Sequence, residues 1–186
     1  MDLLTGEPLA LDLVNTRVVT PSGAVHDALD RADDFQAWLS GQSHRLTVPE
    51  RPLTASGLRA VKTLRGHVEL ILGATREATP PPAASLEALN EALRAAPPYA
   101  YVEARGAVLV SGSRRDGPVL SRLLTELAEA AMTLLTDPSV GKVRSCEAPH
   151  CRMLFLPAHP RRRWCSPDLC GNRVRVARYY QRHKPA

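Results

Sequence analysis

Apolar residues recur at helical spacing in two segments of the first half of the chain. The first segment follows Thr54, a suitable N-cap, and runs to Gly73. Its apolar face consists of Leu58, Val61, Leu64, Val68, Ile71 and Leu72. The second segment lies between the prolines at 80–82 and 97–98, with Ser85 as its cap. Both patterns predict amphipathic helices that face a core.

A third and longer helix is expected from Pro118, which suits a first helical turn, to the Asp137–Pro138 pair that stops it. Its apolar stripe consists of Leu120, Leu123, Leu124, Leu127, Ala131, Leu134 and Leu135. Burial inside a domain explains this stripe, although the same leucines can also serve a homodimer. Before this helix, the runs at 99–104 and 107–111 flank Arg105 and Gly106, a pattern that predicts a β-hairpin.

The segments before Thr54 are shorter. Residues 9–14 read Leu-Ala-Leu-Asp-Leu-Val, which fits either a buried strand or a short helix. The apolar positions between 28 and 39 indicate one or two short helical turns that end at Gly41. Together these elements predict an α+β fold, with a mainly helical N-terminal domain over residues 1–138 that carries a small antiparallel hairpin.

Charge divides the 186-residue chain into two unlike parts, although its formal net charge is only +5. Residues 142–186 contain eleven Lys or Arg and two acidic residues, a net charge of +9, whereas residues 1–141 carry −4. All four cysteines lie in the basic part. The last quarter of the chain is therefore expected to form a separate module with its own chemistry.

The early residues and the hydropathy of the chain predict a soluble, cytoplasmic protein. No Lys or Arg precedes Arg17, so the charged start that a secretory signal peptide needs is not found. No apolar run approaches the roughly 18 residues of a membrane span, and we expect no membrane partner. In a reducing compartment, clustered cysteines are metal ligands more often than disulfide partners.

The cysteines form two close pairs with the spacing of a metal site. They are Cys146, Cys151, Cys165 and Cys170. Each pair encloses four residues, and thirteen residues separate the pairs. Thiolates on two tight turns can complete a tetrahedron, so the pattern predicts one structural Zn²⁺ with no open position for a substrate. His150 and His159 are weaker candidates because four sulfurs already fill the coordination sphere.

The residues around the cysteines predict a zinc finger built from a hairpin and a helix. Residues 153–164 read as two short strands with a basic turn between them. Phe155 and Trp164 can pack beside the metal and replace a core that is too small to form alone. The segment after the last cysteine is helical in pattern, and its Val174 and Ala177 can face the metal core.

Two stretches of the sequence resemble the signatures of known families. Residues 164–166 (Trp-Cys-Ser) and 170–173 (Cys-Gly-Asn-Arg) are similar to the CGNR zinc finger, and residues 11–16 (Leu-Asp-Leu-Val-Asn-Thr) resemble the N-terminal signature of the ABATE domain. Leu13 stands where an aromatic residue is typical of that signature. The resemblance covers essentially the whole chain, with the finger at 142–186. It implies a bacterial, stress-induced transcription regulator whose finger binds DNA or RNA.

A basic module of this kind fits nucleic-acid binding, with DNA favoured over RNA. The expected contacts are Arg161, Arg162, Arg163, Asn172, Arg173, Arg175, Arg178 and Arg182. The last three share one helical stripe, and arginines clustered on a rigid module suit phosphate binding. Asn172 and Arg173 can either read a base edge or hold the finger together. The competing interpretation is a zinc-stabilised protein-interaction module, which docks on an acidic partner or on the chain's own acidic N-terminal domain without binding nucleic acid.

The N-terminal domain shows no catalytic constellation, and we expect no enzymatic activity. Asp12, Asn15 and Arg17 are its candidates for a small-molecule effector pocket, although a helix cap or a buried hydrogen bond is the commoner role of such residues. An effector bound there would act on the finger through the linker at 138–143. No pattern in the chain specifies the target sequence, the effector or the oligomeric state.

Overall fold

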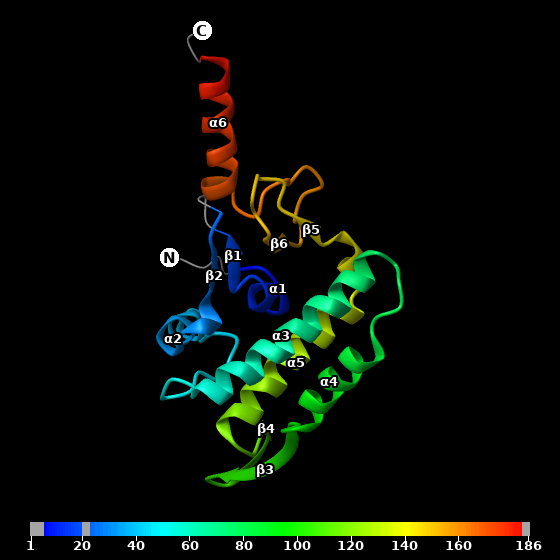
Figure 1. Ribbon diagram of the computed structural model, residues 1–186. Helices are drawn as coiled ribbons and strands as arrows, with labels where there is room; N and C mark the ends of the chain where they lie inside the picture. Colours follow the sequence, from blue (N-terminus) through cyan, green and yellow to red (C-terminus); the bar gives the residue numbers. More distant parts are fainter. Residues whose placement is uncertain (1–5, 20–22, 184–186) are drawn as a thin grey trace.

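The computed structural model describes residues 6–19 and 23–183, which form an elongated molecule with a projection at each end (Figure 1). A mainly helical body (residues 6–136) lies between a β-hairpin arm at one end and the C-terminal finger (residues 143–183) at the other. In the part of the chain described, no helix is both long enough and apolar enough to cross a bilayer.

Three helices form the centre of the body. α3 (Ala55–Arg76) and α5 (Val119–Thr136) run side by side, and α4 (Ala83–Arg94) packs against both (Figure 1). Thr54 caps α3, since its hydroxyl accepts a hydrogen bond from the Gly57 N–H at 3.2 Å. The leucine stripe of α5 belongs to the chain's own core, so packing within the chain accounts for it. The periodicity of the sequence predicted these helices correctly.

The starts of two helices differ from the prediction. Ser85 lies inside the first turn of α4, where Pro82 takes the N-cap position. Its buried hydroxyl lies 3.2 Å from Nδ1 of His67 and so bonds to a side chain of α3 instead of capping a backbone N–H. Pro118 directly precedes α5 as the N-cap residue.

The run at residues 9–14 forms a short helix, α1 (Leu9–Val14), instead of a strand. It packs against α3 and α5, and five of its six residues are buried. Because nearly every face of α1 is covered, its sequence has no polar side from which a helical period could be detected. The elements that follow are β1 (Arg17–Val19), β2 (Val25–Asp27), the 3-10 turn η1 (Ala28–Asp30) and α2 (Ala32–Gly41).

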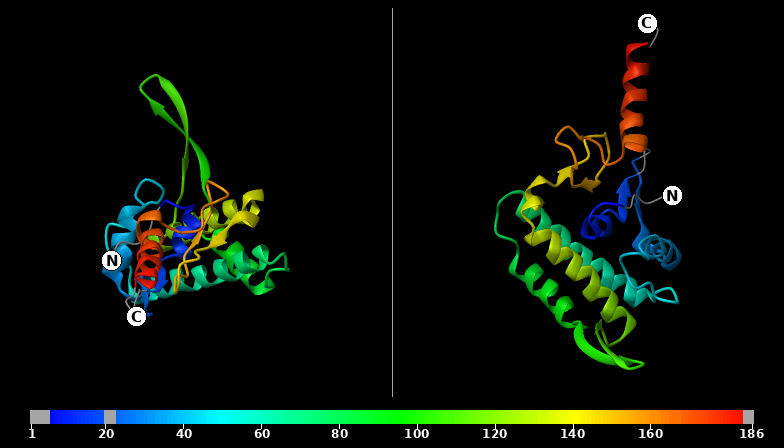
Figure 2. Two further views of the ribbon diagram at one scale, coloured as in Figure 1. Left: turned by 90° about the horizontal axis from the view of Figure 1, so that it is seen from above. Right: turned by 180° about the vertical axis from the view of Figure 1, so that it is seen from behind.

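The hairpin arm consists of β3 (Tyr99–Arg105) and β4 (Val108–Arg114), and it extends well away from the body (Figure 2). Gly106 supplies the left-handed turn residue, with φ of 64°. β3 continues one residue further toward the turn than predicted, and β4 continues three residues further toward the body, where Arg114 pairs with Tyr99. The Tyr101 ring covers Gly112 so closely that a Cβ there would lie 2.7 Å away, and the Arg114 guanidinium lies 4.6 Å from the same ring centre.

The finger contains short elements joined by turns. They are β5 (Arg144–Ser145), β6 (Leu154–Phe155), the π-turn η3 (Pro167–Gly171) and α6 (Asn172–Arg182). β6 pairs with β5, which precedes the first cysteine, so the predicted hairpin between residues 153 and 164 is wrong. Prolines at 157 and 160 interrupt that segment, and the Arg163 carbonyl instead accepts a hydrogen bond from the Glu147 N–H at 3.1 Å.

The apolar core of the body and that of the finger interlock. Val18 of β1 packs in the cysteine-containing cluster of the finger, whereas Leu154 and Leu156 pack against the core of the body. The connecting segment is the 3-10 helix η2 (Pro138–Lys142), and Val140 within it is buried in the body core. The boundary suggested by the sequence near residue 140 therefore lies between two apolar clusters that these side chains bring into contact.

Candidate metal centre and nucleic-acid interface

Four cysteine sulfurs gather in one cluster of the finger. They belong to Cys146, Cys151, Cys165 and Cys170, and all four lie within 4.8 Å of one another. Sγ of Cys165 is 3.8 Å from Sγ of Cys151 and 3.5 Å from Sγ of Cys170. Zinc–sulfur bonds of about 2.3 Å in a tetrahedron place sulfurs about 3.8 Å apart, so this donor set fits one structural zinc ion. His150 and His159 are exposed and are not part of the cluster.

Electrostatics within the cluster also favour a cation. A hydrogen bond from the Cys165 thiol lowers the pKa of Cys151 to about 5, so one thiolate forms readily. The same hydrogen bond raises the pKa of Cys165, and burial raises the pKa of Cys170 to about 12. Negative charge on one sulfur thus opposes ionisation of its neighbours. A bound Zn²⁺ supplies the positive charge that lets all four thiolates coexist.

The Cys-Gly-Asn-Arg segment closes the cluster through a tight turn. η3 starts after Ser166, whose hydroxyl accepts a hydrogen bond from the Leu169 N–H at 3.2 Å. Gly171 passes under the indole of Trp164, and a Cβ at this position would lie 3.1 Å from the ring. The absence of a side chain at Gly171 therefore lets Trp164 cover the turn.

Arg173 ties α6 to the opposite side of the cluster. Its Nη2 atom donates to the Pro149 carbonyl at 3.2 Å and lies 3.6 Å from Sγ of Cys170. These contacts support the structural role for Arg173, whose charge also offsets that of the thiolates. Asn172, in contrast, is exposed, and its side chain makes no hydrogen bond within the described residues.

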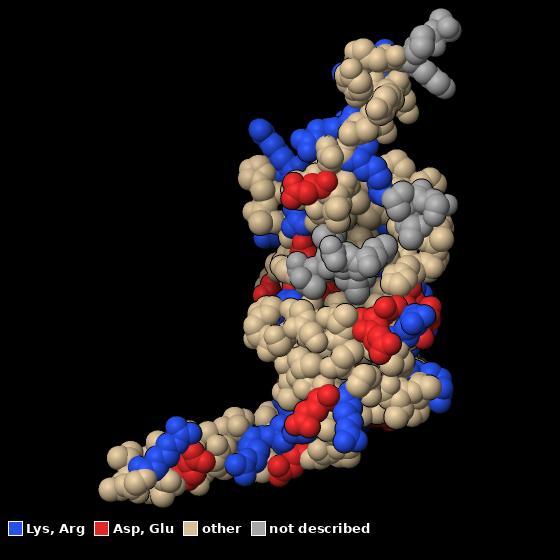
Figure 3. Space-filling model, turned by 90° about the vertical axis from the view of Figure 1, so that its left-hand side faces the viewer, with Lys and Arg blue, Asp and Glu red and all other residues tan. Residues whose placement is uncertain are grey.

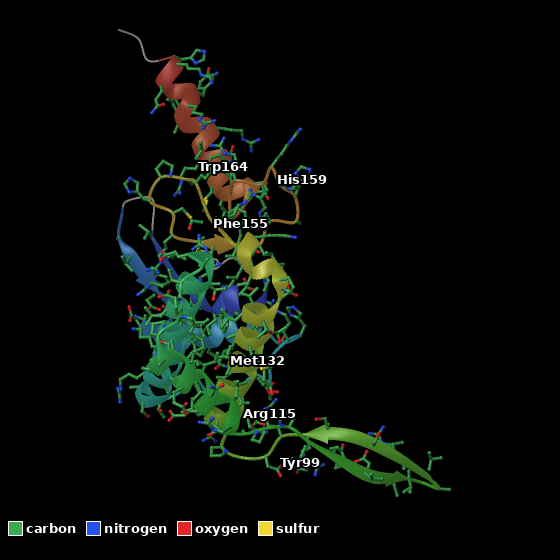
Figure 4. The ribbon with its side chains drawn as sticks, turned by 90° about the vertical axis from the view of Figure 1, so that its right-hand side faces the viewer. Tyr99, Arg115, Met132, Phe155, His159 and Trp164 are labelled. Carbon is green, nitrogen blue, oxygen red and sulfur yellow. The ribbon has the colours of Figure 1, made fainter. Side chains whose placement is uncertain are left out.

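Phe155 and Trp164 pack beside the sulfurs, as predicted (Figure 4). Phe155 is fully buried in the same apolar cluster as the cysteines, and Trp164 packs at its edge. Val174 of α6 joins this cluster. Ala177, which was expected there as well, is exposed because α6 leaves the finger after its first turn (Figure 1).

Polar side chains of the body hold the finger in place. Asn15 follows α1 and pairs with β6: its Nδ2 donates to the Leu154 carbonyl at 2.8 Å, and its Oδ1 accepts from the Leu154 N–H at 2.9 Å. The side-chain amide thus takes the place of a neighbouring strand. Glu7 accepts hydrogen bonds from the Leu156 N–H at 2.9 Å and from Nη2 of Arg162 at 2.6 Å.

A carboxylate on α3 makes a further contact of the same kind. Glu69 bridges Arg17 of β1 at 2.8 Å and Arg152 of the finger at 3.1 Å. We refer to Glu7, Asn15 and Glu69 as the finger latch, because each of them joins the body to the finger.

Asp12 supports the latch from within the body. It is fully buried and accepts hydrogen bonds from the N–H groups of Gly6 at 3.0 Å and Glu7 at 3.3 Å, and it pairs with Arg45. Burial raises the pKa of Asp12, although the hydrogen bond from Arg45 partly offsets this effect. Asp12 thereby fixes the backbone that presents Glu7 to the finger.

The three candidates for an effector pocket, Asp12, Asn15 and Arg17, are thus each engaged by protein partners. Asp12 binds backbone of its own segment, Asn15 binds β6, and Arg17 binds Glu69. Buried or half-buried hydrogen bonding, the commoner role of such residues, describes all three. Nε of Arg17 is buried without a hydrogen-bond partner, so Glu69 satisfies only the Nη2 end of this guanidinium.

α6 projects from the finger with most of its surface free (Figure 1). Within this helix Val174 is the one buried residue. The predicted basic stripe is exposed and consists of Arg175, Arg178 and Arg182. Basic side chains gather around the base of the helix (Figure 3). Two grooves of about 350 and 220 Å³ flank it, and both are lined by Arg163, Trp164 and Arg178.

The arginines expected to bind nucleic acid separate into an inward and an outward group. Arg162 turns inward: it donates to the Cys165 carbonyl at 2.6 Å and lies 4.5 Å from the Phe155 ring centre. Arg163 is exposed but pairs with Glu147, its Nε lying 2.6 Å from the carboxylate. The outward group consists of Arg161 and the α6 stripe of Arg175, Arg178 and Arg182. These side chains are exposed, and their guanidinium groups make no salt bridge within the described residues.

Sequence reasoning did not identify Glu7, Glu69 or Arg152 as functional residues. Glu7 lies 155 positions from its partner Arg162, and Glu69 lies 83 positions from Arg152. Neither helical nor strand periodicity connects residues so far apart. The available signal was the opposite net charge of the two parts of the chain.

Comparison with known proteins agrees with this arrangement. Residues 7–138 match the ABATE family, which is described as "Putative stress-induced transcription regulator", and residues 142–183 match the CGNR zinc finger. A search of curated proteins finds no match to the chain. The first match covers more than half of the chain and includes the whole latch, and the second includes all four cysteines. The chain therefore belongs to the ABATE family and carries a CGNR zinc finger whose four cysteines can coordinate one zinc ion.

Proposed function

We propose that this protein is a transcription regulator without enzymatic activity, and that its finger binds double-stranded DNA through α6. The observation that carries the proposal is the outward group of arginines. These are Arg161, Arg175, Arg178 and Arg182, which make no salt bridge within the described residues. Exposed guanidinium groups without carboxylate partners are available to phosphate oxygens.

The shape of α6 favours a duplex over a single strand. The helix has 11 residues, a length of about 16 Å, and it stands clear of the body (Figure 2). A B-DNA major groove about 12 Å wide admits such a helix. Arg163 lines both grooves beside α6, where it can reach the flanking phosphates. Asn172, whose exposed side chain makes no hydrogen bond within the described residues, remains the candidate for a base contact.

The competing function, a protein-interaction module, also has an observation in its favour. The finger already docks on acidic residues of its own body through Arg152 and Arg162. This contact leaves the outward arginines free, so the two surfaces serve different partners. Docking within the chain fixes the direction of α6 and supports DNA binding by the whole molecule as one unit.

The test is fluorescence anisotropy with the zinc-loaded full chain, a labelled generic duplex and a matching single strand over a salt series. About four neutralised phosphates, one for each arginine of the outward group, give a slope of log affinity against log salt near −4, with the duplex bound more tightly. Replacing Arg175, Arg178 and Arg182 by Gln should reduce the slope by about three.

A matched control removes the same charge far from the finger. Arg51, Arg94 and Arg105 are exposed residues of the body and its arm, and their replacement by Gln should leave the slope unchanged. An equal loss of binding in both triple variants would mean that net charge, and not α6, governs the interaction. No binding by the wild type at low salt would overturn the proposal in favour of a protein-interaction module.

A further inference from the structure

A second basic site lies at the opposite end of the molecule from α6, where the hairpin arm joins the body. A cavity of about 390 Å³ opens there between β4, the first turns of α5 and the loop before α3. Its lining residues include Arg114, Arg115, Arg122, Ser113, Thr47 and Glu126. Charged side chains gather around the root of the arm (Figure 3), and Arg115 lies at this junction (Figure 4).

Arg122 is one of three arginines that line this cavity. Its Nε atom is buried and has no hydrogen-bond partner, and its guanidinium makes no salt bridge within the described residues. An unpaired buried donor is costly, and the cost is greater for a charged group. A guanidinium in this state at the wall of a polar cavity is a binding group for an anion.

The acidic residues nearby are already engaged by other partners. Both carboxylate oxygens of Glu126 accept hydrogen bonds from Thr47, from its N–H at 2.9 Å and from its hydroxyl at 2.8 Å. Glu129 pairs with Arg115 at 2.7 Å. Neither carboxylate forms a salt bridge with Arg122 within the described residues. Glu126, one helical turn away on the same helix, keeps its negative charge because its partner Thr47 is neutral. Arg114 adds a further cation, which is held over the Tyr101 ring.

We propose that this cavity binds a small anion with two or more negative charges. Arg122 and Arg114 provide two planar guanidinium groups that suit carboxylate or phosphate oxygens, and Ser113 adds a hydroxyl donor. The volume falls within the range of about 300–1,000 Å³ that is typical of small-molecule sites. The site is separate from the proposed DNA surface, because the arm and α6 lie at opposite ends of the molecule (Figure 1).

Isothermal titration calorimetry of the zinc-loaded full chain at constant ionic strength tests the proposal. The probes are pyrophosphate and citrate, which near neutral pH present two or more negative charges on phosphate and on carboxylate oxygens respectively. We expect saturable binding of at least one probe with one site per chain. Arg122→Gln should weaken that binding at least about tenfold, because it removes a charge-assisted, bidentate contact.

The finger can also attract anions, so the matched control is Arg178→Gln, which removes the same charge from α6. Affinity for the probe should be unchanged in this variant. Arg114→Gln, at an exposed position, should weaken binding as well and provides a second test if Arg122→Gln perturbs the fold. The proposal is overturned if neither probe binds at concentrations up to about 10 mM. It is equally overturned if Arg178→Gln lowers the affinity while the two cavity variants do not.

Discussion

At the scale of single residues, one buried ion pair organises the start of the body. Asp27 accepts two hydrogen bonds from Arg65, at 2.7 and 2.6 Å, and both side chains are almost fully buried. Arg65 also donates to the Thr16 hydroxyl at 2.8 Å, and Asp27 caps η1 through the Leu29 N–H. Every charge and polar group in this set has a partner, so removal of one member leaves the others unsatisfied.

Asp27→Ala should therefore be strongly destabilising. Loss of the carboxylate leaves the Arg65 guanidinium buried and uncompensated, which lowers the free energy of unfolding by about 3–5 kcal/mol. The matched variant is Asp30→Ala, which breaks the exposed pair with Lys62 and should cost less than about 1 kcal/mol. Urea denaturation followed by circular dichroism measures both. Equal losses of unfolding free energy in the two variants would contradict the conclusion that Asp27 and Arg65 form a buried, stabilising pair.

The same pair makes stability depend on acid pH. Burial alone would raise the pKa of Asp27, but hydrogen bonds from Arg65 and Leu29, with the charges of Arg65 and Lys62, hold it below the ordinary value of 3.8. A carboxyl whose pKa is lowered by folding stabilises the protein above 3.8, and this contribution is lost as the pH falls through the folded-state pKa. Asp12, whose pKa is raised, acts in the opposite direction.

We expect Asp27→Asn to flatten the loss of stability below pH 3.8 relative to the wild type. Thermal unfolding at a series of pH values measures the effect. Zinc loss lowers the stability of both proteins, so it cancels when the stability of one is subtracted from that of the other. The opposite outcome is a difference in unfolding free energy between the wild type and the variant that is constant between pH 6 and pH 3. That result would show that Asp27 has the same pKa in the folded and unfolded states.

The roles of single residues were predictable from the sequence where the type and spacing of neighbouring residues define them. The four cysteines, Phe155 and Trp164 act as expected because their spacing and type suffice to define a metal core. Asn15 was singled out, but its partner could not be, since Leu154 lies 139 positions away and contributes only backbone atoms. No side-chain pattern marks a residue that is recognised through its N–H and carbonyl groups.

At the scale of elements, we expect the finger to depend on the metal and the long helices to be independent of it. Cys165→Ser should abolish zinc binding, because a three-sulfur site leaves the tetrahedron incomplete. Residues 143–183 should then lose protection from amide hydrogen exchange, whereas α3 and α5 keep theirs. Elemental analysis combined with hydrogen exchange tests this expectation. A variant that retains one zinc per chain would contradict the four-cysteine assignment.

The hairpin arm should contribute little to stability through its outer face. Val102 and Leu109 are 68% and 74% exposed, so Val102→Ser and Leu109→Ser should change the free energy of unfolding by less than about 0.5 kcal/mol. Tyr101→Ala should lower the free energy of unfolding by a larger amount, because it uncovers Gly112 and removes the ring beneath Arg114. Chemical denaturation of the three variants provides the comparison. A loss above about 2 kcal/mol for Val102→Ser would show that the face is covered in solution.

Elements were predictable from the sequence when a clear period ran along their length. α3, α4 and α5 have one polar and one apolar side, and their turns carry prolines or a capping threonine. α1 is buried on nearly all sides, and β5 has two residues, so neither leaves a period to detect. The finger hairpin was misassigned for this reason: its first strand is too short to be recognised.

At the scale of the whole molecule, the latch makes the metal site dependent on the body. Asn15→Ala removes both hydrogen-bond partners of Leu154, and each unsatisfied backbone group costs about 1–3 kcal/mol. We expect the finger to open more often and to lose zinc to a chelator at least about tenfold faster than the wild type. Asn90→Ala, at an exposed position of α4, is the control and should release zinc at the wild-type rate.

The opposite net charges of the body and the finger correspond to specific ion pairs in the structure. Two acids of the body, Glu7 and Glu69, neutralise two arginines that face inward, Arg162 and Arg152. The net charges of the two parts predicted that they attract each other. They could not indicate which arginines are used in this contact and which remain on the outer surface, because that choice depends on how the chain folds around the metal.

The pairing of Asn15 with Leu154 also orders the events of folding. Asn15 is synthesised 139 residues before its partner, so its amide is hydrated while the body forms on the ribosome. Closing so long a loop is entropically costly, and the contact becomes favourable only when β6 is already shaped. We therefore expect the finger to be seated last, and a nascent chain deprived of zinc to stop with a completed body and an unattached C-terminal segment.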